Sequence, residues 1–417
     1  MGSPNVLFLA VDSLRADAIF GDRIPTPNID AYARDGAAFT QCIATATTTT
    51  PSFSSMLTGC YPPKHGVRGL QGYTLSPALA TMAEVFSGAG YHTVAEVTGP
   101  LLAETGILRG FEETRHRQAY RVPFFNWREA ITARLPALPS PWFLLLHIWE
   151  VHRPYRAPPK FTKRYDRGGY EAAVAATDEW LRPVFEALPD DTIVVITGDH
   201  GEEFPGSRLE RTANRSIRVA RRQLKTSRWA PGLDKRLGGQ ALGHGYDLNE
   251  PQVRVPLIIS GPGVPACSVT DQVRHIDVLP TLTDLCGVDG TGGRGTAIDG
   301  RSLRAALEGG SLPPEPAYME AVGVKLEGER IIGARTPSWK LLKRSGGRNA
   351  LYRLDDGGKG GREADEKHNL YSSHPGVAGE LEAYIDAIAA TEGVAGSGMT
   401  DEEEAVVEQH LRDLGYL

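Results

Sequence analysis

Short runs of apolar residues alternate with stretches of helical periodicity along much of the chain. The apolar runs occupy residues 5–11, 142–148, 192–197 and 256–260, and turn-forming residues flank them. Residues 170–188 place apolar side chains mainly at the three- and four-residue spacing of a helix. This alternation is typical of βα units. We therefore predict an α/β fold in which helices flank a central, mostly parallel β-sheet.

The pattern changes after a stretch rich in glycine and proline between residues 287 and 316, which is typical of a seam between domains. Strand-like segments follow between residues 317 and 342, and residues 401–414 have the pattern of a helix with an acidic first turn. We predict a large α/β domain over residues 1–315. Residues 316–417 are expected to form a small C-terminal α+β domain with an antiparallel sheet and a terminal helix.

Composition excludes several classes of protein. Hydrophobic residues make up 41% of the 417 residues and charged residues 23%, which are ordinary values for a folded globular chain. No run of about 18 apolar residues occurs, and no basic segment with a cleavage site precedes the first strand-like run, so we expect neither a membrane span nor a secretion signal. The four cysteines are scattered, unlike those of a zinc knuckle or a disulfide scaffold. These features predict a cytoplasmic protein.

Side chains that can ligate a metal stand at the ends of three predicted strands. They are Asp12 after the first strand, His147, Glu150 and His152 at the end of the second, and Asp199 and His200 after the third. The carboxyl ends of the strands form the ligand-binding edge of an open α/β sheet. One aspartate after a strand is usually a turn residue, but three such strand ends indicate a metal site. Mixed carboxylate and imidazole ligands favour zinc, manganese or iron over calcium.

Several ordered motifs give the sequence a family resemblance. They are residues 11–13 (Val-Asp-Ser), 26–30 (Thr-Pro-Asn-Ile-Asp), 49–66 (beginning Thr-Thr-Pro), 198–202 (Gly-Asp-His-Gly-Glu) and 254–258 (Arg-Val-Pro-Leu-Ile). Together they resemble the sulfatase-like branch of the alkaline phosphatase superfamily over nearly the whole chain. The segments 350–354 and 368–371 resemble the small C-terminal domain of sulfatases.

The resemblance breaks at the position of the sulfatase nucleophile. Sulfatases have Cys or Ser there, in the pattern Cys/Ser-x-Pro-x-Arg, and convert it to formylglycine, whereas this chain has Thr49 and Phe53 at the first and last positions. Threonine cannot become formylglycine because its β-carbon carries a methyl group. Thr-x-Pro, followed by Leu-Thr-Gly, Tyr-Pro and His-Gly, is similar instead to nucleotide pyrophosphatase/phosphodiesterases and phosphonoacetate hydrolases, which use the threonine alkoxide directly.

A threonine hydroxyl is a poor nucleophile until a cation stabilises its alkoxide, so a metal ion is expected beside Thr49. The resemblance implies that Asp12, Asp199 and His200, together with Thr49, hold this first divalent ion.

The phosphodiesterase branch implies a second ion site. Its later histidine matches His244 in the sequence Gly-His-Gly-Tyr-Asp. His152 resembles a sulfatase histidine that contacts substrate, so it is a candidate for either a ligand or an anion contact, while Glu150 and His147 compete for the remaining place. We expect two divalent ions, zinc or manganese rather than calcium, which would clamp the attacking and leaving oxygens of a phosphoryl displacement.

Charge is distributed unevenly along the chain. The net charge is −6, but residues 205–240 hold ten basic and two acidic side chains, a local net charge of +8 against −14 for the remainder. Because this basic insertion lies between the proposed ligands His200 and His244, it is either an electrostatic lid for a polyanionic substrate or a solvated loop or homo-oligomer contact. Nucleic acid is a weaker interpretation, since Trp229 is the only aromatic residue in the insertion.

These observations predict a metal-dependent hydrolase that cleaves a phosphate ester, either a phosphodiester or a phosphomonoester, or a phosphonate ester. The reaction would pass through a covalent intermediate on Thr49, with His152 as a second catalytic residue. The expected substrate is small, anionic and phosphorylated, and a nucleotide is one candidate. Two alternatives stay open: an enzyme that cleaves sulfate esters without formylglycine, and a catalytically lapsed metal-binding scaffold protein.

Overall fold

The computed structural model of the chain describes residues 2–165, 169–203, 244–290, 295–324, 330–354, 366, 368–391 and 398–417. The basic insertion at residues 205–240, for which a lid or a contact role is expected, lies outside the described residues.

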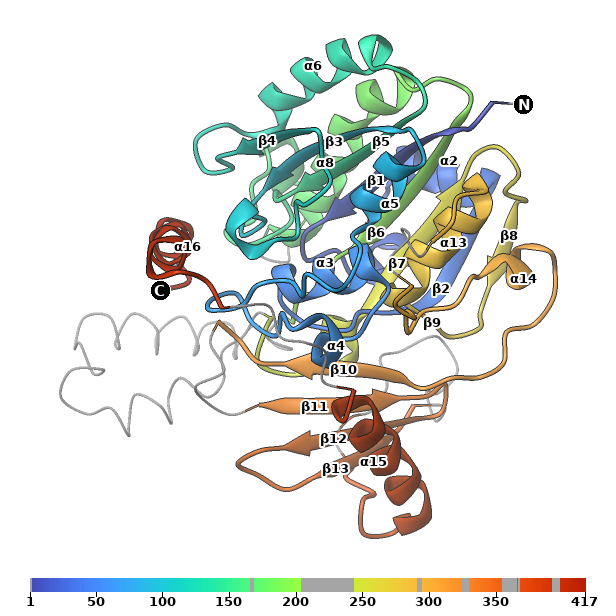
Figure 1. Ribbon diagram of the computed structural model, residues 1–417, viewed down its shortest axis with the longest axis vertical. Coiled ribbons are helices and arrows are strands. Elements are labelled where there is room, and N and C mark those ends of the chain that lie inside the picture. Colours follow the sequence, from blue (N-terminus) through green and yellow to red (C-terminus); the bar gives the residue numbers. More distant parts are fainter. Residues whose placement is uncertain are drawn as a thin grey trace.

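A mixed β-sheet forms the centre of the molecule (Figure 1). In the described part of the chain it has nine strands: β1 Asn5–Val11, β2 Ala37–Ile43, β3 His92–Thr98, β4 Glu113–Arg117, β5 Trp142–Ile148, β6 Thr192–Gly198, β7 Arg254–Ser260, β8 Cys267–Val269 and β9 Val273–Arg274. Their order is β4-β3-β5-β1-β6-β7-β2-β8, with β9 also paired to β2. Strand β7 runs antiparallel to β6 and β2, and the other pairs are parallel. The predicted α/β fold with a mostly parallel sheet is confirmed.

Helices cover both faces of this sheet, which explains why its central strands are apolar without interruption. Along β1, Val6, Phe8 and Ala10 face one buried cluster, and Leu7 and Leu9 face the other. The first cluster includes side chains of α3 Thr49–Thr58, α5 Met82–Gly88, α13 Val278–Cys286 and α14 Arg304–Leu307. The second includes side chains of α1 Ala16–Ile19, α2 Pro27–Asp35, α6 Phe124–Arg134 and α8 Tyr170–Glu186. The remaining short helices are α4 Pro62–His65, α7 Pro159–Thr162 and α12 Glu250–Val253.

A second, smaller sheet packs below the first. It is antiparallel in the order β10 Ala317–Ala321, β11 Ile331–Arg335, β12 Trp339–Arg344 and β13 Ala350–Arg353. Helix α15, Pro375–Ala389, covers one face through Ala378, Leu381 and Ile385. Tyr61 and Ile276, which lie between elements of the larger sheet's half of the chain, belong to the same buried cluster. The two sheets therefore pack through a shared apolar core.

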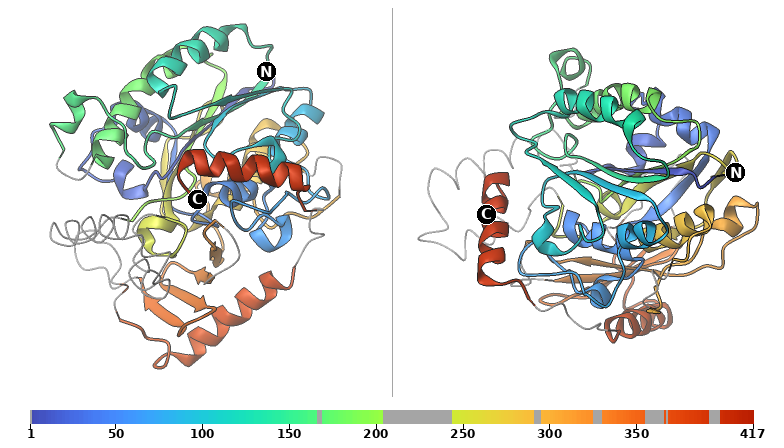
Figure 2. Two further views of the ribbon diagram at one scale, coloured as in Figure 1. Left: turned by 90° about the vertical axis from the view of Figure 1, so that its left-hand side faces the viewer. Right: turned by 45° about the horizontal axis from the view of Figure 1, so that its top comes forward.

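The last helix, α16 Asp401–Leu414, lies apart from α15 and against the large sheet's half of the molecule (Figures 1 and 2). Its buried residues Val407 and Leu411 pack on Leu70, with Leu102 and Val324 at the edge of the cluster. No helix in the part of the chain that the structure describes is long and apolar enough to cross a membrane.

Candidate metal centre

A buried cluster of metal-ligating side chains lies where β1, β5 and β6 end. Asp12 follows β1, His147 lies in β5 beside Ala10 of β1, and Asp199 follows β6. One ligand atom of each lies within 4.8 Å of the others, and all three side chains are fully buried. Because these strands are adjacent and parallel, their carboxyl ends bring the three residues to one place.

Two atoms of this cluster have no hydrogen-bond partner among the described residues. They are His147 Nε2 and Asp199 Oδ2. His147 donates from Nδ1 to the carbonyl of Thr98 at 3.0 Å, so Nε2 carries a lone pair. A buried acceptor without a partner is costly, and a bound cation would satisfy both atoms. The donor set therefore fits a divalent metal ion.

The pKa shifts of the cluster's side chains also favour a bound cation. Burial and the neighbouring Asp199 carboxylate raise the pKa of Asp12 well above its usual range. Burial also lowers the pKa of His147 to about 4, which leaves its imidazole neutral near pH 7. Two buried carboxylates beside a neutral imidazole form a site with excess negative charge, which a divalent cation would neutralise.

Thr49 is the first residue of α3 and lies beside this cluster. Its hydroxyl donates to Asp12 Oδ2 at 3.3 Å and lies 3.5 Å from His200 Nε2. The N-terminus of a helix carries partial positive charge and free backbone N–H groups, so it favours an anion. A substrate anion would therefore be stabilised next to the Thr49 hydroxyl.

His200 is held in one orientation by its ring and its backbone. Its Nδ1 donates to the Gly201 carbonyl at 2.9 Å, which leaves the lone pair on Nε2, 3.4 Å from Asp199 Oδ2. The backbone N–H groups of His200 and Ser13 both donate to Asp199 Oδ1, at 2.8 and 3.0 Å. These bonds turn the other oxygen of Asp199 toward the cluster. The structure thus brings together Asp12, Thr49, Asp199 and His200, the residues expected around the first ion.

Phe53 packs directly against the metal cluster. Its ring meets the ring of His147 edge-on, with centroids 5.0 Å apart and an interplanar angle of 77°. Phe53 is completely buried in the main core, one turn along α3 from Thr49. An apolar ring therefore occupies the position at which the sulfatase pattern has an arginine.

Two further imidazoles, those of His152 and His244, lie near His200 and form a second group. The ring centroid of His244 lies 4.3 Å from that of His200 and 4.9 Å from that of His152. His244 Nδ1 lies 3.4 Å from Oε2 of the fully buried Glu202. His152 Nε2 accepts a hydrogen bond from the Tyr416 hydroxyl at 2.9 Å. The structure therefore places His152 and His244 beside the cluster.

Glu202 and Tyr416 were not among the predicted site residues. Glu202 lies three residues after Asp199, in a motif already singled out, so its carboxylate was the signal that could have identified it. Tyr416 carries no such signal, because nothing in its local sequence relates it to His152, which precedes it by 264 residues.

The structure corrects the expectation that Glu150 is a metal ligand. Both of its oxygens accept from the buried Arg117 guanidinium, at 2.7 and 2.9 Å, and Oε1 also accepts from the Phe124 N–H at 2.7 Å. These hydrogen bonds occupy both oxygens of the Glu150 carboxylate. The cluster's side chain from β5 is that of His147 instead.

We expect Glu150→Gln to lower the free energy of unfolding by about 3 to 5 kcal/mol, because it leaves the buried Arg117 charge without its partner. Metal content should stay at the wild-type level. Chemical denaturation and elemental analysis of the same preparation measure both quantities. Glu179→Gln, which breaks the exposed Lys160–Glu179 pair, is the control and should cost less than about 1 kcal/mol. Loss of metal from Glu150→Gln at unchanged stability would contradict the structural role.

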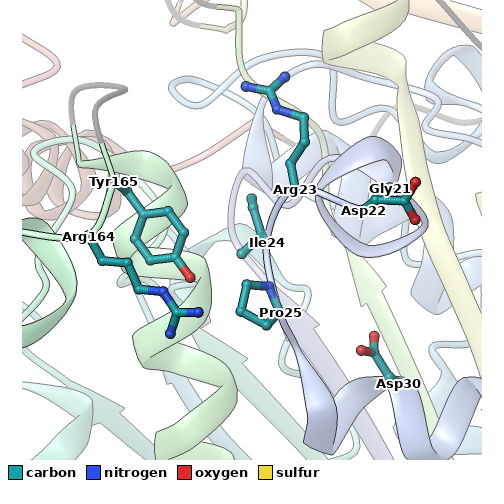
Figure 3. Close-up of a pocket in the computed structure, with 8 residues that line it drawn as sticks. All are labelled: Gly21, Asp22, Arg23, Ile24, Pro25, Asp30, Arg164 and Tyr165. Atoms are coloured by element: carbon teal, nitrogen blue, oxygen red, sulfur yellow. The ribbon is translucent and has the colours of Figure 1, made fainter.

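A surface pocket of about 610 Å³ shares no residue with the metal cluster (Figure 3). Its lining residues are Gly21, Asp22, Arg23, Ile24, Pro25, Asp30, Arg164 and Tyr165. Arg23 also pairs with Glu171 at 2.7 Å. The lining mixes acidic and basic side chains, so it presents no single charge to a ligand.

Fold and site together define a sulfatase-like protein of the alkaline phosphatase superfamily, as the sequence motifs predicted. The family model described as Sulfatase matches residues 4–288, and the chain belongs to this family of hydrolases, which use a divalent metal ion. Steryl-sulfatase of Mus musculus is 24% identical over an alignment of 442 positions, which covers 76% of this chain and 67% of the relative.

Two solved structures show how widely the fold is shared. The phosphonate monoester hydrolase of Agrobacterium radiobacter superposes with a TM-score of 0.70 at 17% identity, covering 93% of this chain and 96% of its own. A 2-O GAG sulfatase superposes with a TM-score of 0.70 at 18% identity, covering 93% of this chain and 92% of its own. Since proteins of both names have this fold, the fold alone does not select the ester.

Proposed function

We propose that this protein is a metal-dependent hydrolase of phosphate or phosphonate esters and that Thr49 is its nucleophile. The observation that carries the proposal is the position of the Thr49 hydroxyl, 3.3 Å from Asp12 Oδ2 and 3.5 Å from His200 Nε2 at the start of a helix. A hydroxyl buried among a carboxylate, an imidazole and a candidate metal site supports the proposal of nucleophilic catalysis. The fold likeness to a phosphonate monoester hydrolase is consistent with this class of substrate.

The chain's own residues suggest how the reaction would proceed. Thr49 Oγ1 would give up its proton and attack phosphorus, and the bond from phosphorus to the ester oxygen would break, so that a phosphoryl or phosphonyl ester of Thr49 forms and the alcohol leaves with a proton. Water would then attack the same phosphorus, break its bond to Thr49 Oγ1, return a proton to that oxygen and release the phosphate or phosphonate. Asp12 Oδ2 and His200 Nε2 are the acceptors nearest to the hydroxyl proton. A divalent ion bound by Asp12, His147 and Asp199 would stabilise the Thr49 alkoxide and the charge on the phosphoryl oxygens.

We also propose roles for the second group of imidazoles. His152 and His244 lie side by side near His200, so they would contact the phosphoryl group or contribute to a second ion site. Zinc and manganese suit the imidazole-containing sets better than calcium does.

The second candidate function is hydrolysis of sulfate esters without formylglycine. Membership of the sulfatase family and the likeness to steryl-sulfatase favour it. Thr49 and Phe53 count against it, because the formylglycine precursor and its arginine are both absent.

A substrate panel separates the two functions. We expect kcat/KM for an aryl phosphate mono- or diester, or for an aryl phosphonate ester, to exceed kcat/KM for the aryl sulfate with the same leaving group by at least about tenfold, equivalent to about 1.4 kcal/mol of transition-state stabilisation. Matching the leaving group leaves the transferred group as the only variable. A clear preference for the sulfate would contradict the proposal, and turnover of none of the esters by metal-loaded protein would favour the scaffold interpretation.

A further inference from the structure

Helix α16 lies against the half of the molecule that contains the large sheet (Figure 2), and contacts at several points anchor it there. Val407 and Leu411 bury their side chains against Leu70. The Tyr120 hydroxyl donates to the Leu414 carbonyl at 3.1 Å, and His410 Nε2 donates to the Gly99 carbonyl at 2.9 Å. Apolar and polar contacts thus fix the carboxyl end of the helix.

A tight turn at the end of α16 sets the position of Tyr416. Gly415 has a φ of +84°, and its N–H donates to the Arg412 carbonyl at 3.0 Å. The Tyr416 N–H then donates back to the Leu411 carbonyl at 2.9 Å. This left-handed glycine turn is a standard helix ending that reverses the chain, and it holds Tyr416 in place.

The Tyr416 hydroxyl is hydrogen-bonded to His152. His152 Nδ1 donates to the Arg153 carbonyl at 2.6 Å, so Nε2 is the acceptor and Tyr416 is the donor of the 2.9 Å bond between them. The Trp149 ring stacks on His152 with centroids 4.0 Å apart, which fixes the imidazole plane. His152 in this tautomer accepts a hydrogen bond at Nε2, and its ring lies beside that of His244, with centroids 4.9 Å apart.

An anionic substrate needs hydrogen-bond donors here, because buried carboxylates lie beside the imidazoles: Asp199 Oδ2 is 3.4 Å from His200 Nε2, and Glu202 Oε2 is 3.4 Å from His244 Nδ1. Phe53 supplies no guanidinium, and that of Arg153 is already paired with Glu202 Oε1 at 3.4 Å and bonded to the Tyr155 hydroxyl and the Glu203 carbonyl. A neutral hydroxyl on a fixed turn can donate to an anion without the cost of desolvating a further charge.

We propose that Tyr416 is a substrate-contact residue whose hydroxyl donates to a non-bridging oxygen of the bound phosphoryl group, so that the carboxyl-terminal segment 415–417 completes the active site. The inference rests on the proposed function for the identity of the anion. Tyr416 exchanges its bond to His152 for one to the substrate, and His152 Nε2 becomes free to take a proton or a ligand.

The test compares Tyr416→Phe with Tyr384→Phe in the full-length, metal-loaded protein. Tyr384 of α15 is the matched control, because its hydroxyl is also hydrogen-bonded, to the Pro316 carbonyl at 2.8 Å, outside the metal cluster. We expect Tyr416→Phe to weaken binding of inorganic phosphate, measured by calorimetry, by about tenfold, the effect of losing a hydrogen bond to a charged group. It should lower kcat/KM for the preferred ester by a similar factor, and Tyr384→Phe should change neither quantity.

Each outcome separates this inference from the proposed function. Unchanged phosphate binding by Tyr416→Phe would overturn the inference, while turnover by the wild type would still support the function. Tighter binding would overturn it by showing that Tyr416 competes with the anion for His152. Wild-type protein that binds no phosphate would overturn it too, and the ester panel then decides the function separately. Weakened binding by Tyr416→Phe, in a protein that turns over no ester, would support the anion contact and remove the proposed reaction.

Discussion

Thr49→Ala is expected to lower kcat by a factor of about 10³ or more, the scale of loss when a covalent catalytic unit is broken. The substitution removes the hydroxyl that contacts Asp12 and His200 and leaves Asp12, His147 and Asp199 in place. Metal content and thermal stability should therefore stay close to those of the wild type. Steady-state kinetics on the best ester of the panel, with elemental analysis of the same preparation, measure the effect.

The neighbouring threonines provide matched controls for this prediction. Thr50 donates its hydroxyl to the Pro100 carbonyl at 3.3 Å, and Thr48 precedes the helix as its N-cap residue without a side-chain cap bond. Thr48→Ala and Thr50→Ala should each retain most of the activity, and Thr49→Ser should retain more than Thr49→Ala because it keeps a hydroxyl. An active Thr49→Ala beside an inactive Thr48→Ala or Thr50→Ala would assign the nucleophile to another threonine of the run.

Removal of the metal by chelation and dialysis is expected to lower turnover by a factor of about 10² to 10³, since a cation at the reacting oxygens contributes several kcal/mol to transition-state stabilisation. Zinc or manganese should restore activity. Both ions should also raise the unfolding temperature, because a cation that binds only the folded state stabilises it. Restoration by calcium alone would revive the sulfatase interpretation, and undiminished turnover in metal-free protein would contradict the mechanism.

His147→Ala tests the ligand set through metal retention alone. His147 offers an unpaired Nε2 to the cluster, so its loss should reduce the zinc or manganese that survives dialysis at least about tenfold. His92→Ala is the control, because His92 pairs with Glu112 and Glu113 at the sheet edge. A variant lacking His147 that keeps the wild-type metal content would exclude this histidine as a ligand.

The central strands could be predicted because burial on both faces made them apolar without interruption. β1, β5 and β6 are fully buried along their lengths. β3 and β4 were not predicted, since β3 contains the buried Glu96, which pairs with Arg134 at 2.7 Å, and β4 is a polar edge strand. Their stability depends on partners that are distant in sequence, and no local pattern reports those partners.

The site residues also divide into those that local sequence patterns predicted and those that depend on distant partners. Asp12, Asp199 and His200 follow strands that the sequence identified, so their meeting at one sheet edge could be predicted. Glu150 follows the end of β5, where the alternation of a strand no longer fixes the side-chain direction, and its partner Arg117 comes from the unpredicted β4. Tyr416 is brought to His152 by the tertiary contacts of α16, namely its packing on Leu70 and its hydrogen bonds with Tyr120 and Gly99.

The edge-on contact between Phe53 and His147 also restricts how this chain can evolve. The sulfatase pattern would require arginine at position 53, where the side chain is completely buried in the main core and against the ring of His147. A guanidinium there would have to be desolvated and would compete with a bound cation for the carboxylates of the cluster, and unpaired it would cost several kcal/mol, a large fraction of the stability of a typical domain. Replacing Thr49 with cysteine would therefore supply only half of the maturation motif, because the buried Phe53 ring fills the position of the other half. The buried ring of Phe53 therefore couples the two positions: the sulfatase pattern would need repacking around position 53 as well as a new side chain at position 49.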